Sequence, residues 1–173
     1  YDENHPLSQG PVRVEHPGSA VNLEYDGLQR LAKVAQVVGT NEVRSRRYDY
    51  DLLGRKVKET DQDGAVLAWD YEALGRLTTQ PHALGGVRRY VWDEASRLTS
   101  VVDERGNVWS NEYDGEDRLT GEWDAEGHVR TRAYDQAGNL HWRVDAKGQK
   151  TAYQYDGAGR VTEALFYASN NHT

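Results

Sequence analysis

The sequence contains no cysteine and no methionine, and it has only one phenylalanine and four prolines among its 173 residues. The absence of cysteine excludes a disulfide scaffold and any thiolate metal site. There is no run of about 18 apolar residues and no signal-peptide pattern, so the sequence predicts no membrane span and carries no export signal. Because the chain opens on Tyr1 rather than on methionine, we expect it to be a piece of a longer polypeptide.

Apolar residues and positive charge are also scarce. The hydrophobic fraction is 37% and the mean hydropathy is −0.88, which is low for a self-contained globular core. The net charge of −7 argues against a nucleic-acid partner, since phosphate contacts need clustered lysine and arginine. Five tryptophans and eleven tyrosines supply the large side chains, and they keep a polar end. We therefore expect a thin apolar stripe in place of a compact core.

What the sequence does contain is a repeat. The stretch YDGAGRVT at 155–162 has earlier versions, which are YDQAGNLH from Tyr134, YDGEDRLT from Tyr113, WDEASRLT from Trp92, YEALGRLT from Tyr71, YDLLGRKV from Tyr50 and YDGLQRLA from Tyr25. The leading aromatic residue recurs every 21 residues from Tyr50 to Tyr155, and YDENHPLS at 1–8 is interpreted as a worn copy. A fixed period of this length indicates a repeat architecture, in which each unit is stable only against its neighbours.

Each repeat divides into two turns and two strands. The Asp-x-x-Gly at Asp51–Gly54 and its equivalents predicts a type I turn followed by a left-handed residue, which glycine adopts without a Cβ penalty. Copies with Gln29, Ser96 or Asp117 in place of glycine should be strained or open. A second Asp-x-x-Gly follows at 61–64, 103–106, 124–127 and 145–148, and apolar and polar residues alternate between the turns. The sequence therefore predicts an all-β fold, a continuous antiparallel strip of hairpins that curves into a spiralling sheet.

The predicted organisation has three parts. Residues 1–24 form an irregular or degenerate linking repeat with VRVEH as a strand candidate, and its prolines confine any strand to an edge. Residues 25–165 form the repeat array, and residues 166–173 form a polar tail. The stretch 28–38 has passable helical spacing, but its place in the repeat favours a strand. A propeller is the alternative, because two repeats make about the length of a four-stranded blade.

An arginine five residues after the leading aromatic recurs in nearly every copy, with Asn139 as the departure. We expect each guanidinium to reach the aspartate of its own or the adjacent turn, or to lie over a neighbouring tyrosine ring. The residues expected to be structural parts of the repeat motif are Tyr25, Asp26, Arg30, Tyr50, Asp51, Gly54, Arg55, Tyr71, Gly75, Arg76, Trp92, Asp93, Arg97, Tyr113, Asp114, Arg118, Tyr134, Asp135, Gly138, Tyr155, Asp156, Gly159 and Arg160.

No constellation of catalytic residues is found. The six histidines form no HExxH or i, i+4 pair, and there is no G-x-S-x-G elbow. The aspartate-rich turns, of which 61–64 is the most suggestive, match neither an EF-hand loop nor a glycine-paired nonapeptide. We therefore expect no enzyme activity, no cofactor and no metal site.

The repeated YDxxGRLT with its intervening Asp-x-x-Gly resembles the RHS or YD repeat, over residues 23–165. Trp92, Glu72 and Asn139 depart from the pattern. The resemblance implies a β-sheet strip that spirals into a hollow shell. In bacterial Rhs effectors and Tc toxin B and C components such shells enclose a toxic C-terminal domain, and similar repeats occur in the teneurins. The DPxGL-like motif of the self-cleaving segment does not occur here, so no protease residues are transferred.

The resulting functional hypothesis is a non-enzymatic shell segment of a secreted or surface-exposed bacterial toxin-delivery protein. Its expected partners are the remaining repeats and the enclosed toxin domain of a longer parent chain, together with other copies through open sheet edges. The alternative is an adhesive array that binds carbohydrate or protein through its tyrosine and tryptophan rows. The two differ in whether the aromatic side chains are stacked or stand open in clefts.

Overall fold

The computed structural model describes residues 12–82 and 84–168, and these residues form strands and turns. Within this part of the chain there is no helix of the length and apolarity needed to cross a membrane. The expected copy at 1–8 and residues 169–173 of the expected tail lie outside the described residues. The chain divides into two compact units, Tyr1–Gly85 and Gly86–Thr173.

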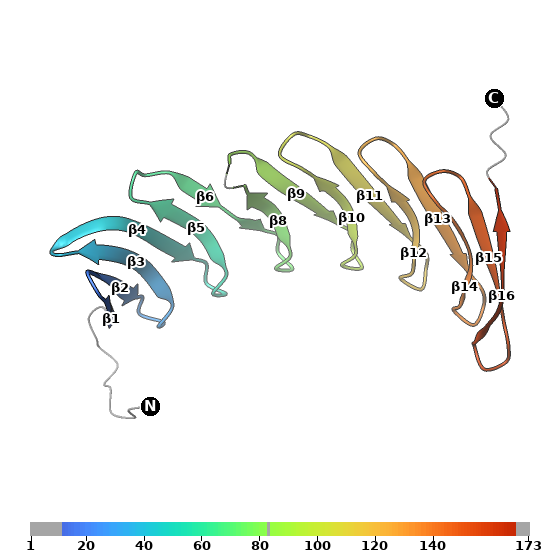
Figure 1. The fold of residues 1–173 in the computed structure, drawn as a ribbon, viewed down its shortest axis with the longest axis horizontal. Helices are drawn as coiled ribbons and strands as arrows, with labels where there is room; N and C mark the ends of the chain where they lie inside the picture. Colours follow the sequence, from blue (N-terminus) through green and yellow to red (C-terminus); the bar gives the residue numbers. More distant parts are fainter. Residues whose placement is uncertain (1–11, 83, 169–173) are drawn as a thin grey trace. The chain divides into compact units, whose positions relative to one another are not determined.

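The first unit holds eight strands in chain order (Figure 1). They are β1 (Val12–His16), β2 (Ser19–Tyr25), β3 (Leu31–Val38), β4 (Asn41–Tyr50), β5 (Lys56–Asp61), β6 (Val66–Ala68), β7 (Asp70–Tyr71) and β8 (Leu77–Pro81). Strands β1 to β6 form an antiparallel sheet in sequence order, with β1 at its edge. The expected strand VRVEH is β1, and the stretch with passable helical spacing forms β3, so both predictions are confirmed.

The second unit also holds eight strands. They are β9 (Val87–Trp92), β10 (Leu98–Val102), β11 (Val108–Tyr113), β12 (Leu119–Trp123), β13 (Val129–Tyr134), β14 (Leu140–Val144), β15 (Lys150–Tyr155) and β16 (Val161–Tyr167). Each pairs antiparallel with the next strand in the sequence. Strand β16 extends to Tyr167, past the expected end of the array at Leu165.

Within the first unit, β1 to β6 form one antiparallel sheet and β7 pairs antiparallel with β8; within the second unit, β9 to β16 pair antiparallel in sequence order. The all-β antiparallel prediction is therefore confirmed. Between β6 and β7 the strand pairing lapses at Trp69, although its amide still donates to the carbonyl of Val57 at 3.0 Å. The predicted strip of hairpins thus runs in sequence order through each unit.

The turns have the predicted backbone. Gly54 has a φ of 81°, and its amide donates to the carbonyl of Asp51 at 3.1 Å. Gln29, Ser96 and Asp117 have φ values of 62°, 68° and 64°, which an L-residue rarely adopts. Their turns keep the same closing hydrogen bond, at 2.9 to 3.2 Å. These copies are therefore strained rather than open.

Very little of the described chain is fully buried. The buried apolar residues are Ala20, Ala35 and Val37, in β2 and β3, and Thr151 is the buried polar residue. Most other strand residues are half-buried, as expected for an apolar stripe spread thinly over many repeats. Cohesion between the repeats must therefore depend heavily on polar and aromatic contacts.

Candidate functional site

The side chains that recur in each repeat meet at the turn after the leading aromatic residue. In the turn between β11 and β12, the amide of Asp114 donates to the carbonyl of Arg118 at 2.9 Å. The Oδ1 atom of Asp114 accepts the amides of Glu116 and Arg118, both at 3.0 Å. This carboxylate therefore caps the turn from one side, which is the usual role of aspartate at such a position.

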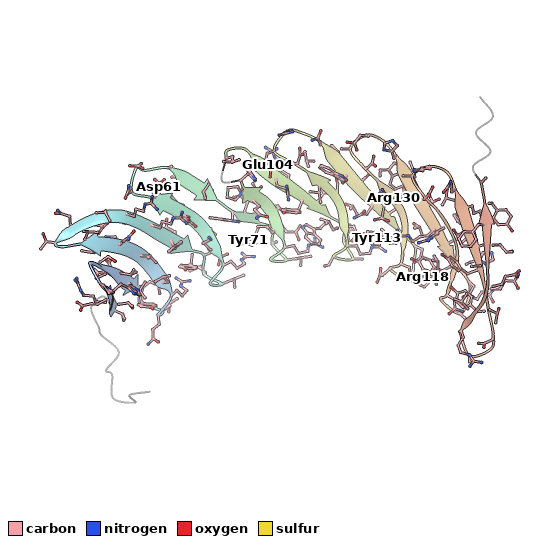
Figure 2. The ribbon with its side chains drawn as sticks, viewed as in Figure 1. Asp61, Tyr71, Glu104, Tyr113, Arg118 and Arg130 are labelled. Carbon is pink, nitrogen blue, oxygen red and sulfur yellow. The ribbon has the colours of Figure 1, made fainter. Side chains whose placement is uncertain are left out.

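The second carboxylate oxygen of the same aspartate binds the arginine of the turn. Nε of Arg118, which is labelled in Figure 2, donates to Oδ2 of Asp114 at 2.7 Å. Both side chains are about three-quarters buried. Equivalent Nε to Oδ2 bonds join Arg30 to Asp26 at 2.7 Å, Arg55 to Asp51 at 2.6 Å, Arg97 to Asp93 at 2.7 Å and Arg160 to Asp156 at 2.8 Å. Arg76 pairs with Glu72 in the repeat that lacks the aspartate.

Four arginines of this kind, Arg30, Arg55, Arg97 and Arg118, also reach the next repeat. Each guanidinium lies over the ring of the leading tyrosine one repeat further along, which is a cation–π arrangement. The distances from Cζ to the ring centroid are 4.8 Å for Arg30 over Tyr50, 4.6 Å for Arg55 over Tyr71, 5.1 Å for Arg97 over Tyr113 and 4.7 Å for Arg118 over Tyr134.

The tyrosine so covered returns a hydrogen bond to the preceding repeat. Its hydroxyl donates to the main-chain carbonyl of the residue that follows the arginine. The bonds are Tyr50 to Leu31 at 2.9 Å, Tyr71 to Lys56 at 3.2 Å, Tyr113 to Leu98 at 3.0 Å, Tyr134 to Leu119 at 3.0 Å and Tyr155 to Leu140 at 2.9 Å.

We call this set the inter-repeat clasp: the turn aspartate, the arginine of the same turn and the leading tyrosine of the next repeat, as in Asp114, Arg118 and Tyr134. The aspartate and the tyrosine were expected from the sequence as partners of the arginine. The bond from the tyrosine hydroxyl to the carbonyl was not expected. The available signal was the choice of tyrosine over phenylalanine, since the chain has eleven of one and one of the other.

The clasp keeps its carboxylates ionised. The amide of Arg30 donating to the carboxylate is the largest influence on Asp26, and it lowers the pKa of that carboxyl, with burial opposing and the guanidinium of Arg30 adding to the effect. For Asp114, burial is the largest single influence and acts upward, but the hydrogen bonds from Arg118 and Glu116 together leave the pKa lowered. The hydrogen bond to Asp114 is in turn the largest cause of a raised pKa for Arg118.

One described repeat lacks the arginine of the clasp. Asn139 replaces the arginine, and its Nδ2 donates to Oδ2 of Asp135 at 3.0 Å, so the turn is still capped. The short amide side chain brings no guanidinium to Tyr155, whose hydroxyl nevertheless donates to the carbonyl of Leu140. The capping of the turn and the stacking between repeats are therefore separable parts of the clasp.

Four of the second turns have the same aspartate cap without the clasp, at Asp61, Asp103, Asp124 and Asp145. In the turn at 61–64, Oδ1 of Asp61 accepts the amides of Asp63 and Ala65 at 3.0 and 2.8 Å. Among the described residues, Asp124, Glu126 and His128 have potential metal-ligand atoms within 4.8 Å of one another. Nδ1 of His128 lies 3.0 Å from Oδ2 of Asp124, so these two groups already form a pair within the turn.

Comparison with known proteins identifies the same repeats. The family model described as RHS Repeat matches residues 71–108, 113–140 and 142–165. No curated protein sequence matches the chain.

Similar solved structures share the fold at low sequence identity. A crystal structure of TcdB2-TccC3-Cdc42 aligns with a TM-score of 0.59 and 14% identity, covering 88% of this chain and 9% of that one. The Tc holotoxin pore of Photorhabdus luminescens aligns with a TM-score of 0.53 and 16% identity, covering 87% and 10%. A crystal structure of TcdB2-TccC3 gives 0.52 and 16%, covering 87% and 11%. The chain thus spans about a tenth of the length of the chains it resembles.

Proposed function

Because the chain belongs to the RHS-repeat family, we propose that it is a non-enzymatic structural segment, a stretch of the wall of a shell that encloses a toxic C-terminal domain in a bacterial toxin-delivery protein. The similarity in fold to structures titled as Tc toxin complexes supports this proposal. The remaining repeats and the enclosed domain would belong to a longer parent chain. That parent would be secreted or exposed on the bacterial surface.

The observation that carries the proposal is the inter-repeat clasp. We propose that the recurring aspartates, arginines and leading tyrosines are the structural framework of the wall. In the clasp of Asp114, Arg118 and Tyr134, the carboxylate fixes the arginine of its own turn, while the guanidinium and the tyrosine hydroxyl each bind a neighbouring repeat. Contacts of this kind extend a sheet one repeat at a time without a thick core, because each repeat needs only its neighbours. A long wall can be assembled in this way from a sequence of low hydropathy.

The alternative is an adhesive array that binds glycan or protein through its aromatic residues. In the clasps, the faces and hydroxyls of the leading tyrosines are occupied by the preceding repeat, which supports the wall over the array. Binding of a defined glycan would nevertheless favour the array, so it belongs in the same test.

The test uses the open edge of the second sheet. Strand β16 is the last strand of its sheet and all seven of its residues are exposed, with Leu165 and Phe166 among them. A wall segment with such an edge should associate more strongly as its concentration rises, as measured by sedimentation across a concentration series. The variant Leu165→Lys should weaken the association, because charge on an edge strand opposes pairing.

The matched control is Leu74→Lys, which places the same charge on an exposed turn residue outside β16. It should leave the association unchanged. A monomer at every concentration that also retains one defined glycan on a glycan array would refute the wall-segment proposal and support the adhesive array.

A further inference from the structure

A groove of about 800 Å³ lies over β13 to β16, wholly within the second unit. The strand register places one row of side chains across its floor. Arg132 lies directly opposite Arg143, Arg143 opposite Thr151, and Thr151 opposite Phe166. Directly opposed residues share a face of the sheet, so two guanidinium groups, a buried hydroxyl and an aromatic ring line one side of the groove.

A third arginine joins this row. Arg130 lies two residues before Arg132 on β13, and alternate residues of a strand share a face (Figure 2). Glu122 is directly opposite Arg130, yet its carboxylate pairs with Arg132 instead. Among the described residues, the guanidinium groups of Arg130 and Arg143 therefore have no ion pair or hydrogen bond.

The groove also contains Asp145 and Lys150. Oδ1 of Asp145 accepts the amides of Lys147 and Gln149, both at 2.9 Å, and so caps its own turn. Nζ of Lys150 lies 4.8 Å from the ring centroid of Trp142. Lys150 alternates with Thr151 and lies opposite Val144, so its side chain is on the other face of the sheet from the arginine row. With Arg132 neutralised by its glutamate, the positive charges of Arg130 and Arg143 outnumber the single carboxylate of the groove.

The arginine pair is not part of the repeat pattern. At the position of Arg132 three other repeats carry Trp69, Tyr90 and Tyr153, and at the position of Arg143 two others carry Glu59 and Glu122. Like charges directly opposite each other on neighbouring strands destabilise a sheet. This repeat thus places the unneutralised positive charge of Arg143 opposite Arg132, at a cost that a bound anion would offset.

We propose that this groove binds an extended acidic segment of a partner protein that carries carboxylates at alternate positions. An extended peptide presents every second side chain to the same side at a spacing of about 6.7 Å, which is also the spacing of Arg130 and Arg132 along β13. The Cβ atoms of Arg132 and Arg143 are about 5 Å apart, so one carboxylate can bridge both guanidinium groups. The next carboxylate along the peptide then reaches Arg130.

The aromatic end of the row defines a second requirement. The ring of Phe166 is 79% exposed at the end of the row, beside the Thr151 hydroxyl. An apolar residue adjacent to the acidic segment would cover it. The match between the spacing of a strand and that of the arginines favours a polypeptide over a sulfated sugar chain. The inference rests on local charge and register, and it does not depend on the proposed wall function.

The probe is a short blocked peptide that alternates glutamate with alanine and carries a fluorescent label, titrated with the whole chain and followed by anisotropy. Arg143→Gln and Arg130→Gln should each weaken binding about ten-fold or more, because each removes charge-assisted hydrogen bonds. The matched control is Arg89→Gln, which removes an exposed arginine of β9 outside the groove. It should leave the affinity within about two-fold.

Two further peptides test the spacing and the charge. A peptide with glutamine at every glutamate position should not bind, and one with the same glutamates in adjacent pairs should bind more weakly than the alternating peptide. Without peptide, Arg143→Gln should leave the thermal midpoint unchanged or higher, since it removes the repulsion from Arg132.

Equal binding of the glutamine peptide, or an equal loss of affinity in Arg89→Gln and Arg143→Gln, would overturn the proposal. Binding of a sulfated oligosaccharide, together with no binding of the alternating peptide, would also overturn the proposal.

Discussion

Replacing Asn139 with arginine should stabilise the protein, because it completes the one clasp that lacks a guanidinium. Asn139 already caps its turn through Asp135, so the added energy comes from the stacking over Tyr155. Asn139 approaches the following turn as Arg118 does: a Cβ at Gly159 would lie 3.8 Å from Oδ1 of Asn139, and a Cβ at Gly138 would lie 3.9 Å from Nη1 of Arg118.

The magnitude follows from the contact. A cation–π pair at an exposed site contributes about 0.5–1 kcal/mol. For a chain of this length, about 1 kcal/mol shifts the thermal midpoint by roughly 2–4 °C. Asn139→Arg should therefore raise the midpoint by about 1–4 °C, followed by tryptophan fluorescence. Midpoints should be compared without a two-state fit, because repeat arrays often unfold in parts.

The mirror substitution is the matched control. Arg118→Asn converts a complete clasp into the arrangement of Asn139, and it should lower the midpoint by a similar amount. A double-mutant cycle isolates the contact, since Tyr155→Leu removes the ring. If Asn139→Arg stabilises equally with and without the ring of Tyr155, the stacking account of the clasp is wrong.

The remaining predictions concern the turn backbone and its carboxylates. Ser96→Gly should stabilise the protein by roughly 0.5–1 kcal/mol, because Ser96 has a φ of 68° that glycine adopts without strain. Urea unfolding would measure the change in stability. A loss of stability would contradict the inference that the backbone at Ser96 is strained. The pKa of Asp26 is lowered in the folded state, chiefly by the hydrogen bond from the amide of Arg30. The ionised carboxylate therefore contributes fully to stability above the ordinary aspartate pKa of about 3.9, and this contribution is lost as the pH falls through the lower pKa of the folded state. Thermal midpoints measured from neutral to acid pH should fall in that window, and Asp26→Asn should fall less steeply there than the parent chain; equal slopes would contradict the assignment.

Much of the fold could be predicted from the sequence because its determinants are local. A turn such as Asp51–Gly54 depends on a carboxylate and a left-handed residue within four positions, and both are visible in the sequence. The alternation between turns predicts strands, and the fixed period predicts that consecutive strands pair in order. The apolar residues of the stretch that forms β3 have a spacing that is passable for a helix, but the place of this stretch in the repeat predicted a strand.

Only part of the candidate site could be predicted from the sequence, because some of its contacts are not local. The bond between Arg118 and Asp114 spans four residues and was expected, as was the stacking of arginine over a neighbouring tyrosine, whereas the bond from the Tyr134 hydroxyl to the carbonyl of Leu119 depends on the register between repeats. The groove arginines could not be predicted from the repeat pattern, because Arg130 and Arg143 do not recur at the equivalent positions of the other repeats. The available signal was that arginine replaces the glutamate or aromatic residue of other repeats.

The sequence by itself determined the period, the two turns of each repeat and the all-β class, because hydrogen bonding within four residues and alternation along a strand require no distant partner. Only the tertiary structure decided which side chains meet across strands. A tyrosine hydroxyl reaches a carbonyl of the preceding repeat, and Arg143 faces Arg132, because strand register sets the distances between residues that are far apart in the chain. Register depends on how neighbouring repeats pair and bulge, and no single repeat encodes it alone.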